Sequence, residues 1–353
     1  MHPISGRYLG RITNSATHGD LEMDLRIDID RLRERSLTCN CISWDLIQQF
    51  EEEIAGRICR WQVDRGSWIL QAPKVSEDGL QIHGTAVEWS TGTEIQVRIS
   101  ISGNRQDDTY TEIILDDGTT VSRYQCRRSS DFFREITLQV DVCESVNSEP
   151  VLPEYHTAQG MLTLESVFAD AGIKVSVSRG ANLVSDRVRG WTPAELHQTM
   201  KAHFSDLSDS PQWKLWGLVA GRFHKSDVSG IMFNRAEFGS RLPERRGFAV
   251  FRQHPSFTGL RSDEAGWQKS EAARKYLHTF VHEIGHAFNL QHPWEQQRPD
   301  ALSWMNTEGY YDERNGQGSF WRDFDFQFDC EELIHLRHGR RLAVIFGGDG
   351  WRC

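Results

Sequence analysis

Residues 270–292, SEAARKYLHTFVHEIGHAFNLQH, contain the most regular apolar pattern in the chain. Over 270–289 the apolar side chains recur every three or four residues, which is the spacing of one face of an α-helix. His282 and His286 lie on the opposite face of that helix. The stretch therefore predicts a long helix that buries one face and presents two histidines on the other.

The two histidines belong to the pattern H-E-x-x-H, which residues 282–286, HEIGH, complete. Residues four apart lie one turn apart on a helix, so the imidazoles of His282 and His286 can reach one Zn2+ ion. Glu283 between them can act as a general base on a water molecule at the metal. A further histidine, His292, follows at a fixed spacing. Requiring it lowers the number of chance occurrences expected in this composition from about 0.04 to about 0.002.

The extended segment 282–292, HEIGHAFNLQH, resembles the metzincin zinc-peptidase motif H-E-x-x-H-x-x-G-x-x-H. The resemblance implies that His282, His286 and His292 bind Zn2+. The family has a glycine with positive φ where the chain turns back toward the metal. Here that residue is Asn289, which tolerates the left-handed conformation next best after glycine.

Residues 303–306, Ser-Trp-Met-Asn, resemble the methionine turn that lies beneath the zinc site of metzincins. The resemblance implies that Met305 packs against the imidazoles without binding the metal. Some metzincins carry a tyrosine two residues after this methionine, which contacts the metal or the oxyanion. That residue is Thr307 here, so the nearby Tyr310 and Tyr311 are the candidates for substrate or oxyanion contacts.

Residues 247–251, GFAVF, precede the predicted zinc helix and are typical of a strand. In metzincins the strand before this helix is a sheet edge that pairs with an extended substrate. The resemblance implies main-chain recognition of a peptide along this strand, and an internal strand is the equally weighted alternative. The residues assigned to this substrate edge are Gly247, Phe248, Ala249 and Val250.

The first 147 residues have the pattern of an all-β domain. Residues 94–102, EIQVRISIS, alternate between apolar and polar side chains, and residues 134–143 repeat the alternation. Asp117-Gly118 between two such runs supplies the positive φ angles of a tight hairpin. Short alternating strands with turn signals favour an antiparallel sandwich or barrel, and we take a sandwich-like domain as the expectation.

Residues 148–160 contain two prolines and little periodicity, so we expect a linker there. Helix and strand patterns alternate after it. The predicted fold class for 161–353 is a metzincin-like α+β catalytic domain, with a twisted sheet and the long zinc-binding helix. The preceding β domain has three alternative roles, as a propeptide, as a substrate-recruiting module or as a partner-binding domain.

The net charge of −10 argues against a general nucleic-acid binder, which would present a basic face. No apolar run reaches the ~18 residues of a transmembrane helix. The first residues lack the basic and apolar regions of a signal peptide, which favours a cytoplasmic location, with export by a signal-independent route as the alternative. The oligomeric state is not predicted by any pattern.

The predicted activity is that of a zinc-dependent endopeptidase that binds a protein or peptide in extended form, with Glu283 as general base. A rival metal site would use Glu308 as third ligand, as in peptidases resembling thermolysin. Two other functions stay open at this stage. One is a non-catalytic peptide-binding protein that contains zinc, and the other is a zinc hydrolase of a non-peptide bond.

Overall fold

The computed structural model describes residues 4–12, 21–29, 41–54, 57–102, 110–116, 118, 121–146, 150–208, 210–233, 245–261 and 263–351. The chain divides into two compact units. The first consists of Met1–Arg134 and Leu333–Arg341, and the second of Glu135–Glu332 and Leu342–Cys353. The linker expected at 148–160 therefore lies inside the second unit, and Asp117 of the expected hairpin turn lies outside the described residues.

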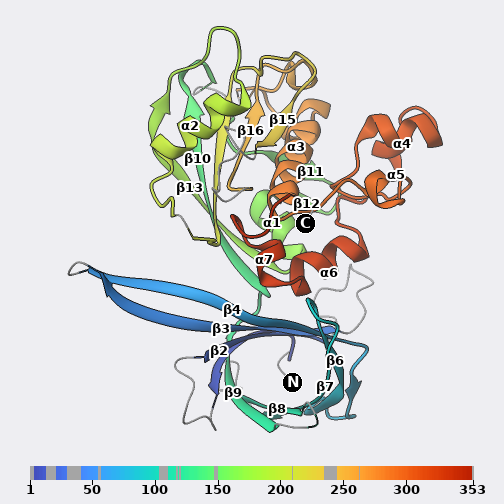
Figure 1. Cartoon of the computed structure of the whole chain (residues 1–353). Helices are drawn as coiled ribbons and strands as arrows, with labels where there is room; N and C mark the ends of the chain where they lie inside the picture. The colour runs from blue at the N-terminus through green and yellow to red at the C-terminus, as the bar shows by residue number, and fades with distance from the viewer. Residues whose placement is uncertain are drawn as a thin grey trace. The chain divides into compact units, whose positions relative to one another are not determined.

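The first unit is a closed antiparallel β-barrel (Figure 1). Its strands follow the order β4-β3-β2-β1-β9-β8-β7-β6-β5, and β4 also pairs with β6. The closing pairs are Trp68 with Glu88 and Ile69 with Val87. The strands are β1 (Gly6–Ile12), β2 (Leu21–Asp28), β3 (Cys41–Ile54), β4 (Arg57–Gln71), β5 (Lys74–Val75), β6 (Gln81–Glu88), β7 (Glu94–Ser102), β8 (Tyr110–Asp116) and β9 (Val121–Ser130).

The fold class predicted from the sequence is wrong. The first unit is a closed barrel of eight strands, β1–β4 and β6–β9, not a sandwich, and the chain, with 41% strand and 26% helix, does not have the predicted metzincin-like α+β fold class. Apolar–polar alternation reports which face of a strand is buried, and that face is the same in a sandwich and in a barrel. Closure depends on the pairing of β4 with β6, which no local pattern specifies.

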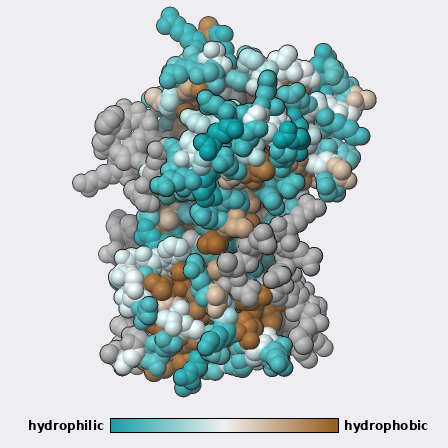
Figure 2. All heavy atoms as spheres, turned by 90° about the vertical axis from the view of Figure 1, so that its right-hand side faces the viewer, coloured by the Kyte–Doolittle hydropathy of each residue, from teal (hydrophilic) through white to brown (hydrophobic). Residues whose placement is uncertain are grey.

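One apolar cluster fills the barrel. Alternate residues of β2 are fully buried in it, namely Met23, Leu25 and Ile27. As its alternation predicts, β7 contributes a row of four buried residues, Ile95, Val97, Ile99 and Ile101. The residues between them in β2 point to the other face of the strand and are polar or charged. On the face drawn in Figure 2, hydrophobic residues gather over the barrel unit, whereas the second unit is mostly hydrophilic.

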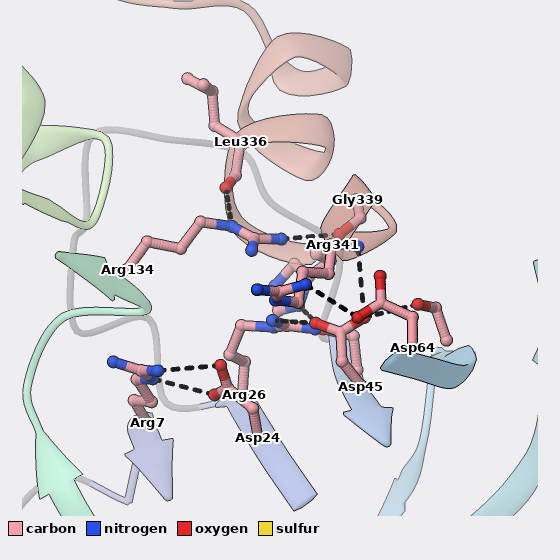
Figure 3. A network of polar contacts seen from close by, with 12 residues as sticks. Arg7, Asp24, Arg26, Asp45, Asp64, Arg134, Leu336, Gly339 and Arg341 are labelled. Atoms are coloured by element: carbon pink, nitrogen blue, oxygen red, sulfur yellow. Dashed lines mark hydrogen bonds and ion pairs between the residues drawn. The ribbon is translucent and has the colours of Figure 1, made fainter. Parts of the chain in front are cut away.

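Buried charges on the outer face of the barrel bind residues from the far end of the chain (Figure 3). Arg26 donates hydrogen bonds to Ser43 Oγ at 3.0 Å and to Asp45 Oδ2 at 2.7 Å. The main-chain N–H of Arg341 donates to Asp45 Oδ1 at 3.2 Å, and its side chain donates to Asp64 at 2.8 Å.

The C-terminal residues 336–341 are bound to the barrel unit at two further points. Arg134 donates to the carbonyl oxygens of Leu336 and Gly339 at 2.7 and 2.6 Å, and Arg337 pairs with Asp28 at 3.0 Å. Leaving one partner of a buried ion pair alone costs roughly 3–5 kcal/mol. Removing the first 134 residues would take away these partners of Arg337 and Arg341, which argues against the propeptide alternative.

The second unit is built on a five-stranded mixed sheet in the order β13-β10-β14-β16-β15. β10 is parallel to β14 and β14 to β16, whereas β15 is antiparallel to β16. A separate hairpin pairs β11 with β12. The strands are β10 (Arg134–Cys143), β11 (Glu154–Thr157), β12 (Gly160–Thr163), β13 (Ile173–Val184), β14 (Lys214–Ala220), β15 (Gly230–Phe233) and β16 (Gly247–Phe251).

The helices begin where the sequence carries capping residues. Thr192 and Glu195 form a capping box at the start of α2, and Ser270 caps α3. α3 packs its apolar face on the sheet, where Phe280 meets Phe248 edge-on. The helices are α1 (Leu164–Asp170), α2 (Pro193–His203), α3 (Glu271–Ala287), α4 (Glu308–Asn315), α5 (Ser319–Asp323), α6 (Cys330–His338) and α7 (Arg341–Val344), and the 3-10 turns are η2 (Glu144–Val146), η3 (Pro255–Phe257), η4 (Trp267–Lys269) and η5 (Pro293–Gln296).

In the part of the chain that the structure describes, no helix has the length and apolar character needed to span a membrane.

The barrel should lose stability in mild acid through His338. This buried ring lies 3.0 Å from Ser43 Oγ and 3.6 Å from Asp28, with Arg26 and Arg337 nearby, and burial lowers its pKa to about 4. Between pH 6.5 and 4.5 His338 becomes almost fully protonated in the unfolded chain but only partly protonated in the folded chain. The free energy of unfolding should therefore fall by about 2 kcal/mol from this residue alone.

Urea unfolding at the two pH values, for the wild type and for His338→Gln, measures this contribution. The variant should lose less stability between them. Equal losses in both proteins would show that His338 does not cause the acid sensitivity.

Candidate metal centre

Three histidine side chains converge in the second unit. His282 and His286 lie one turn apart on α3, and His292 lies just before η5. The Nε2 atom of His292 is 3.3 Å from Nε2 of His282 and 3.1 Å from Nε2 of His286. One nitrogen from each ring lies within 4.8 Å of the others, and no other such group of His, Cys, Asp or Glu is found among the described residues.

The third histidine reaches the other two because the chain reverses at the end of α3. Asn289 has φ = 70°, its N–H donates to the His286 carbonyl at 2.9 Å, and the Leu290 N–H donates to the Gly285 carbonyl at 3.0 Å. These two bonds form a Schellman motif, which requires a left-handed residue at this position. The left-handed conformation expected for Asn289 is confirmed.

In each of the three rings the other nitrogen, Nδ1, lies within hydrogen-bond distance of an oxygen acceptor. Nδ1 of His282 lies 2.9 Å from the Trp304 carbonyl, and Nδ1 of His286 lies 2.8 Å from the Leu290 carbonyl. A carbonyl oxygen only accepts, so both Nδ1 atoms carry the proton. Nδ1 of His292 lies 3.1 Å from a carboxylate oxygen of Glu295, which selects the same tautomer.

The donor set fits a zinc ion. In neutral rings of this tautomer, each Nε2 presents a lone pair toward the others, an arrangement that a cation between them stabilises. Burial first, and then the neighbouring histidines, lower the pKa of His282 well below its usual value, so this ring is neutral as a ligand must be. Nitrogens bound tetrahedrally at about 2.0–2.1 Å from zinc lie about 3.3 Å apart, close to the observed separations.

Glu283 is held against the sheet edge. Its carboxylate is buried and accepts a hydrogen bond from the Met232 N–H of β15 at 2.6 Å. Burial raises the pKa of Glu283 to about 8, and the Met232 hydrogen bond opposes that rise. A dication bound to the adjacent histidines would favour the carboxylate form.

Gly230 is a site residue that sequence reasoning missed. A Cβ atom at this position would lie 2.5 Å from Thr279 Cγ2 and 2.9 Å from Glu283 Oε1. The absence of a side chain therefore lets the Glu283 carboxylate lie against β15. Only the glycine in GIMFN at 230–234 could have signalled this close approach, and one glycine in a strand is a weak signal.

The substrate-edge assignment is wrong for residues 247–250. These residues belong to β16, which pairs with β14 on one side and with β15 on the other. Of the described strands on this side of the sheet, β15 lies at the edge. The order of strands along the chain differs from their order in the sheet, because β15 precedes β16 in the chain and lies outside it in the sheet.

The turn at 303–306 supports α3. The Asn306 N–H donates to the Ser303 carbonyl at 3.2 Å, which closes the turn, and its Trp304 carbonyl accepts from His282. Met305 is fully buried, and a Cβ atom at Gly285 would overlap its sulfur atom. Met305 thus packs on α3 between the two histidines of the helix, and its role beneath a bound metal stays a prediction.

Tyr310 and Tyr311 differ in their surroundings. The Tyr310 ring stacks on Trp294 at 4.1 Å between ring centroids, and Trp294 stacks on His292 at 4.1 Å. Tyr311 is buried and packs on Phe320. Tyr310 is thus the nearer of the two to the histidine group through stacked rings, and a contact of either tyrosine with substrate or oxyanion stays a prediction.

Two tryptophans border the histidine group without having been predicted. Trp294 covers one face of the His292 ring, and Trp351 meets the His286 ring edge-on at 5.0 Å. Both contacts restrict how the ligand rings rotate. Trp294 follows the motif by two residues and could have been noticed, whereas nothing in the sequence brings Trp351 near His286.

No protein-family model and no curated protein matches this chain. Among solved structures, the chain is similar to the crystal structure of metalloproteinase-II from Bacteroides fragilis, with 9% identity and a TM-score of 0.29. The match covers 78% of this chain and 86% of that chain.

The purified protein should contain about one zinc per chain, and His286→Ala should lose it, because two imidazoles do not complete the ligand set. The control is His156→Ala, which removes an exposed histidine of β11. Elemental analysis after dialysis against dilute zinc measures the ratio. Zinc retained in full by His286→Ala would place the metal elsewhere.

Proposed function

We propose that this protein is a zinc-dependent endopeptidase. The observation that carries the proposal is the convergence of three histidine Nε2 atoms beside a buried glutamate that is fixed to a sheet edge. The histidines would hold the metal, and Glu283 would act as the base. A purely structural zinc site has no use for Glu283, which favours a hydrolase over a non-catalytic zinc protein.

A zinc ion on these nitrogens would supply Lewis acidity, which polarises a carbonyl group and eases the ionisation of water. Glu283 would take the proton from the attacking water and deliver it to the leaving amine. The Met232 N–H fixes the position of the carboxylate. The resemblance to metzincins supports this reaction through the motif at 282–292 and not through the fold.

The outer side of β15 is suited to an extended peptide. Ser229 O accepts from Phe251 N, so the main-chain groups of Gly230 and Met232 point away from β16 in an antiparallel pair. The Met232 N–H on that side donates to Glu283. A peptide paired with this edge would lie on the side of β15 that faces the proposed base, and main-chain pairing suits many sequences. This placement favours a peptide over another hydrolysable bond.

Glu283→Gln should bind zinc as the wild type does and lose activity by about 10²-fold or more, because an amide keeps the shape but cannot accept the proton. Cleavage of a mixed peptide library, followed by mass spectrometry, measures the rate, with zinc content as the parallel reading. The matched control is Glu271→Gln, an exposed carboxylate on the same helix that pairs with Lys275.

Wild-type cleavage by Glu283→Gln would exclude Glu283 as the base. A zinc-loaded wild type that binds library peptides and cleaves none would support the non-catalytic alternative.

Gly230→Ala should lower kcat by about 10- to 100-fold with zinc content unchanged, because the new methyl group displaces the Glu283 carboxylate and misplacement by about 1 Å can cost that much. Gly309→Ala on α4 is the control, since no atom lies within 4 Å of the added carbon there. Steady-state kinetics on a cleaved library peptide provides the measurement. An unchanged kcat in Gly230→Ala would mean that contact with β15 does not position Glu283.

A further inference from the structure

Glu332 is a buried carboxyl group in the first turn of α6 for which the proposed reaction has no use. It is 2% exposed. Its Oε2 accepts from the Asp329 N–H at 2.9 Å, and Asp329 Oδ1 accepts from the Glu332 N–H at 2.9 Å. These two bonds form a capping box, which occupies one carboxylate oxygen. The other oxygen, Oε1, accepts from Ser303 Oγ at 2.8 Å.

The hydroxyl group of Ser303 is used in both directions. It donates to Glu332 and accepts from the Met305 N–H at 3.1 Å. Ser303, Trp304, Met305 and Asn306 are each at most 1% exposed. The carboxylate therefore fixes the direction of the hydroxyl group, and the hydroxyl group fixes the turn.

The turn connects Glu332 and Ser303 to His282, a histidine of the proposed metal centre. The Trp304 carbonyl, between Ser303 and Met305, accepts from His282 Nδ1 at 2.9 Å. The position of that carbonyl selects the tautomer of His282 and the rotation of its ring. Outer partners of this kind commonly change metal affinity by 10- to 100-fold when they are removed.

We infer that Glu332 is a positioning residue of the metal centre, which orients His282 through the Ser303 hydroxyl group and the Trp304 carbonyl. The inference rests on the proposed metal centre and assigns the residue no contact with metal or substrate. It gives a function to the capped N-terminus of α6. It also explains why the turn carries a serine at 303 and why a carboxylate is buried opposite it.

The test uses the full-length chain with Zn2+ and Co2+ as probes. Ser303→Ala removes the hydroxyl group and leaves the capping box of α6 intact. Glu332→Ala removes both contacts, and Glu332→Gln keeps a carbonyl oxygen that can accept from Ser303. Glu331→Gln is the matched control, because this neighbouring carboxylate is exposed and pairs with Arg298.

Competition with a chromophoric chelator gives the zinc affinity, and the visible spectrum of bound Co2+ reports the ligand geometry. We expect Ser303→Ala and Glu332→Ala to bind zinc about 10-fold more weakly and to shift the Co2+ spectrum. Glu332→Gln should recover most of the affinity, and Glu331→Gln should match the wild type. Circular dichroism identifies any variant that does not fold, and Ser303→Ala then decides the result.

Wild-type affinity and an unchanged Co2+ spectrum in folded Ser303→Ala and Glu332→Ala would overturn the role of Glu332 and leave the proposed function intact. A wild-type chain that binds neither ion would overturn both.

Discussion

The Nε2 atom of His292 lies 3.1 Å from that of His286 and 3.3 Å from that of His282. In each of the three rings the other nitrogen, Nδ1, faces an oxygen acceptor. Two carbonyl oxygens and one carboxylate select the Nδ1-protonated tautomer, so the Nε2 lone pairs face one another, an arrangement that a bound cation would stabilise. Three parts of the surrounding structure position these rings. α3 provides His282 and His286 in register, the left-handed Asn289 returns the chain, and the turn at 303–306 presents a carbonyl to His282.

The same helix carries Glu283, the proposed general base. The side chain of Glu283 lies against β15. There the Met232 N–H donates a hydrogen bond to its carboxylate, and Gly230 has no side chain to displace it. A sheet edge and a buried base thus meet at one strand. This placement would let main-chain recognition of a peptide and proton transfer occur side by side.

Local features of this chain were predictable, and long-range ones were not. The histidine spacing, the capping box at Thr192 and the conformation of Asn289 follow from interactions within a few residues. Closure of the barrel depends on the pairing of β4 with β6, and the position of β15 outside β16 depends on the sheet order. The buried charges of the barrel bind residues about 200 to 300 positions away, as the Arg337–Asp28 bond illustrates. The need for glycine at Gly230 becomes visible only when Glu283 lies against it.

Zinc-edge X-ray absorption of the metal-loaded chain would count and identify the atoms bound to the ion. If the three histidines hold the metal, the spectrum should show three imidazole nitrogens at about 2.0–2.1 Å, together with oxygen, and should lose imidazole scattering when His292 is replaced. Sulfur at about 2.3 Å, or an unchanged imidazole signal in that variant, would place the metal on other residues.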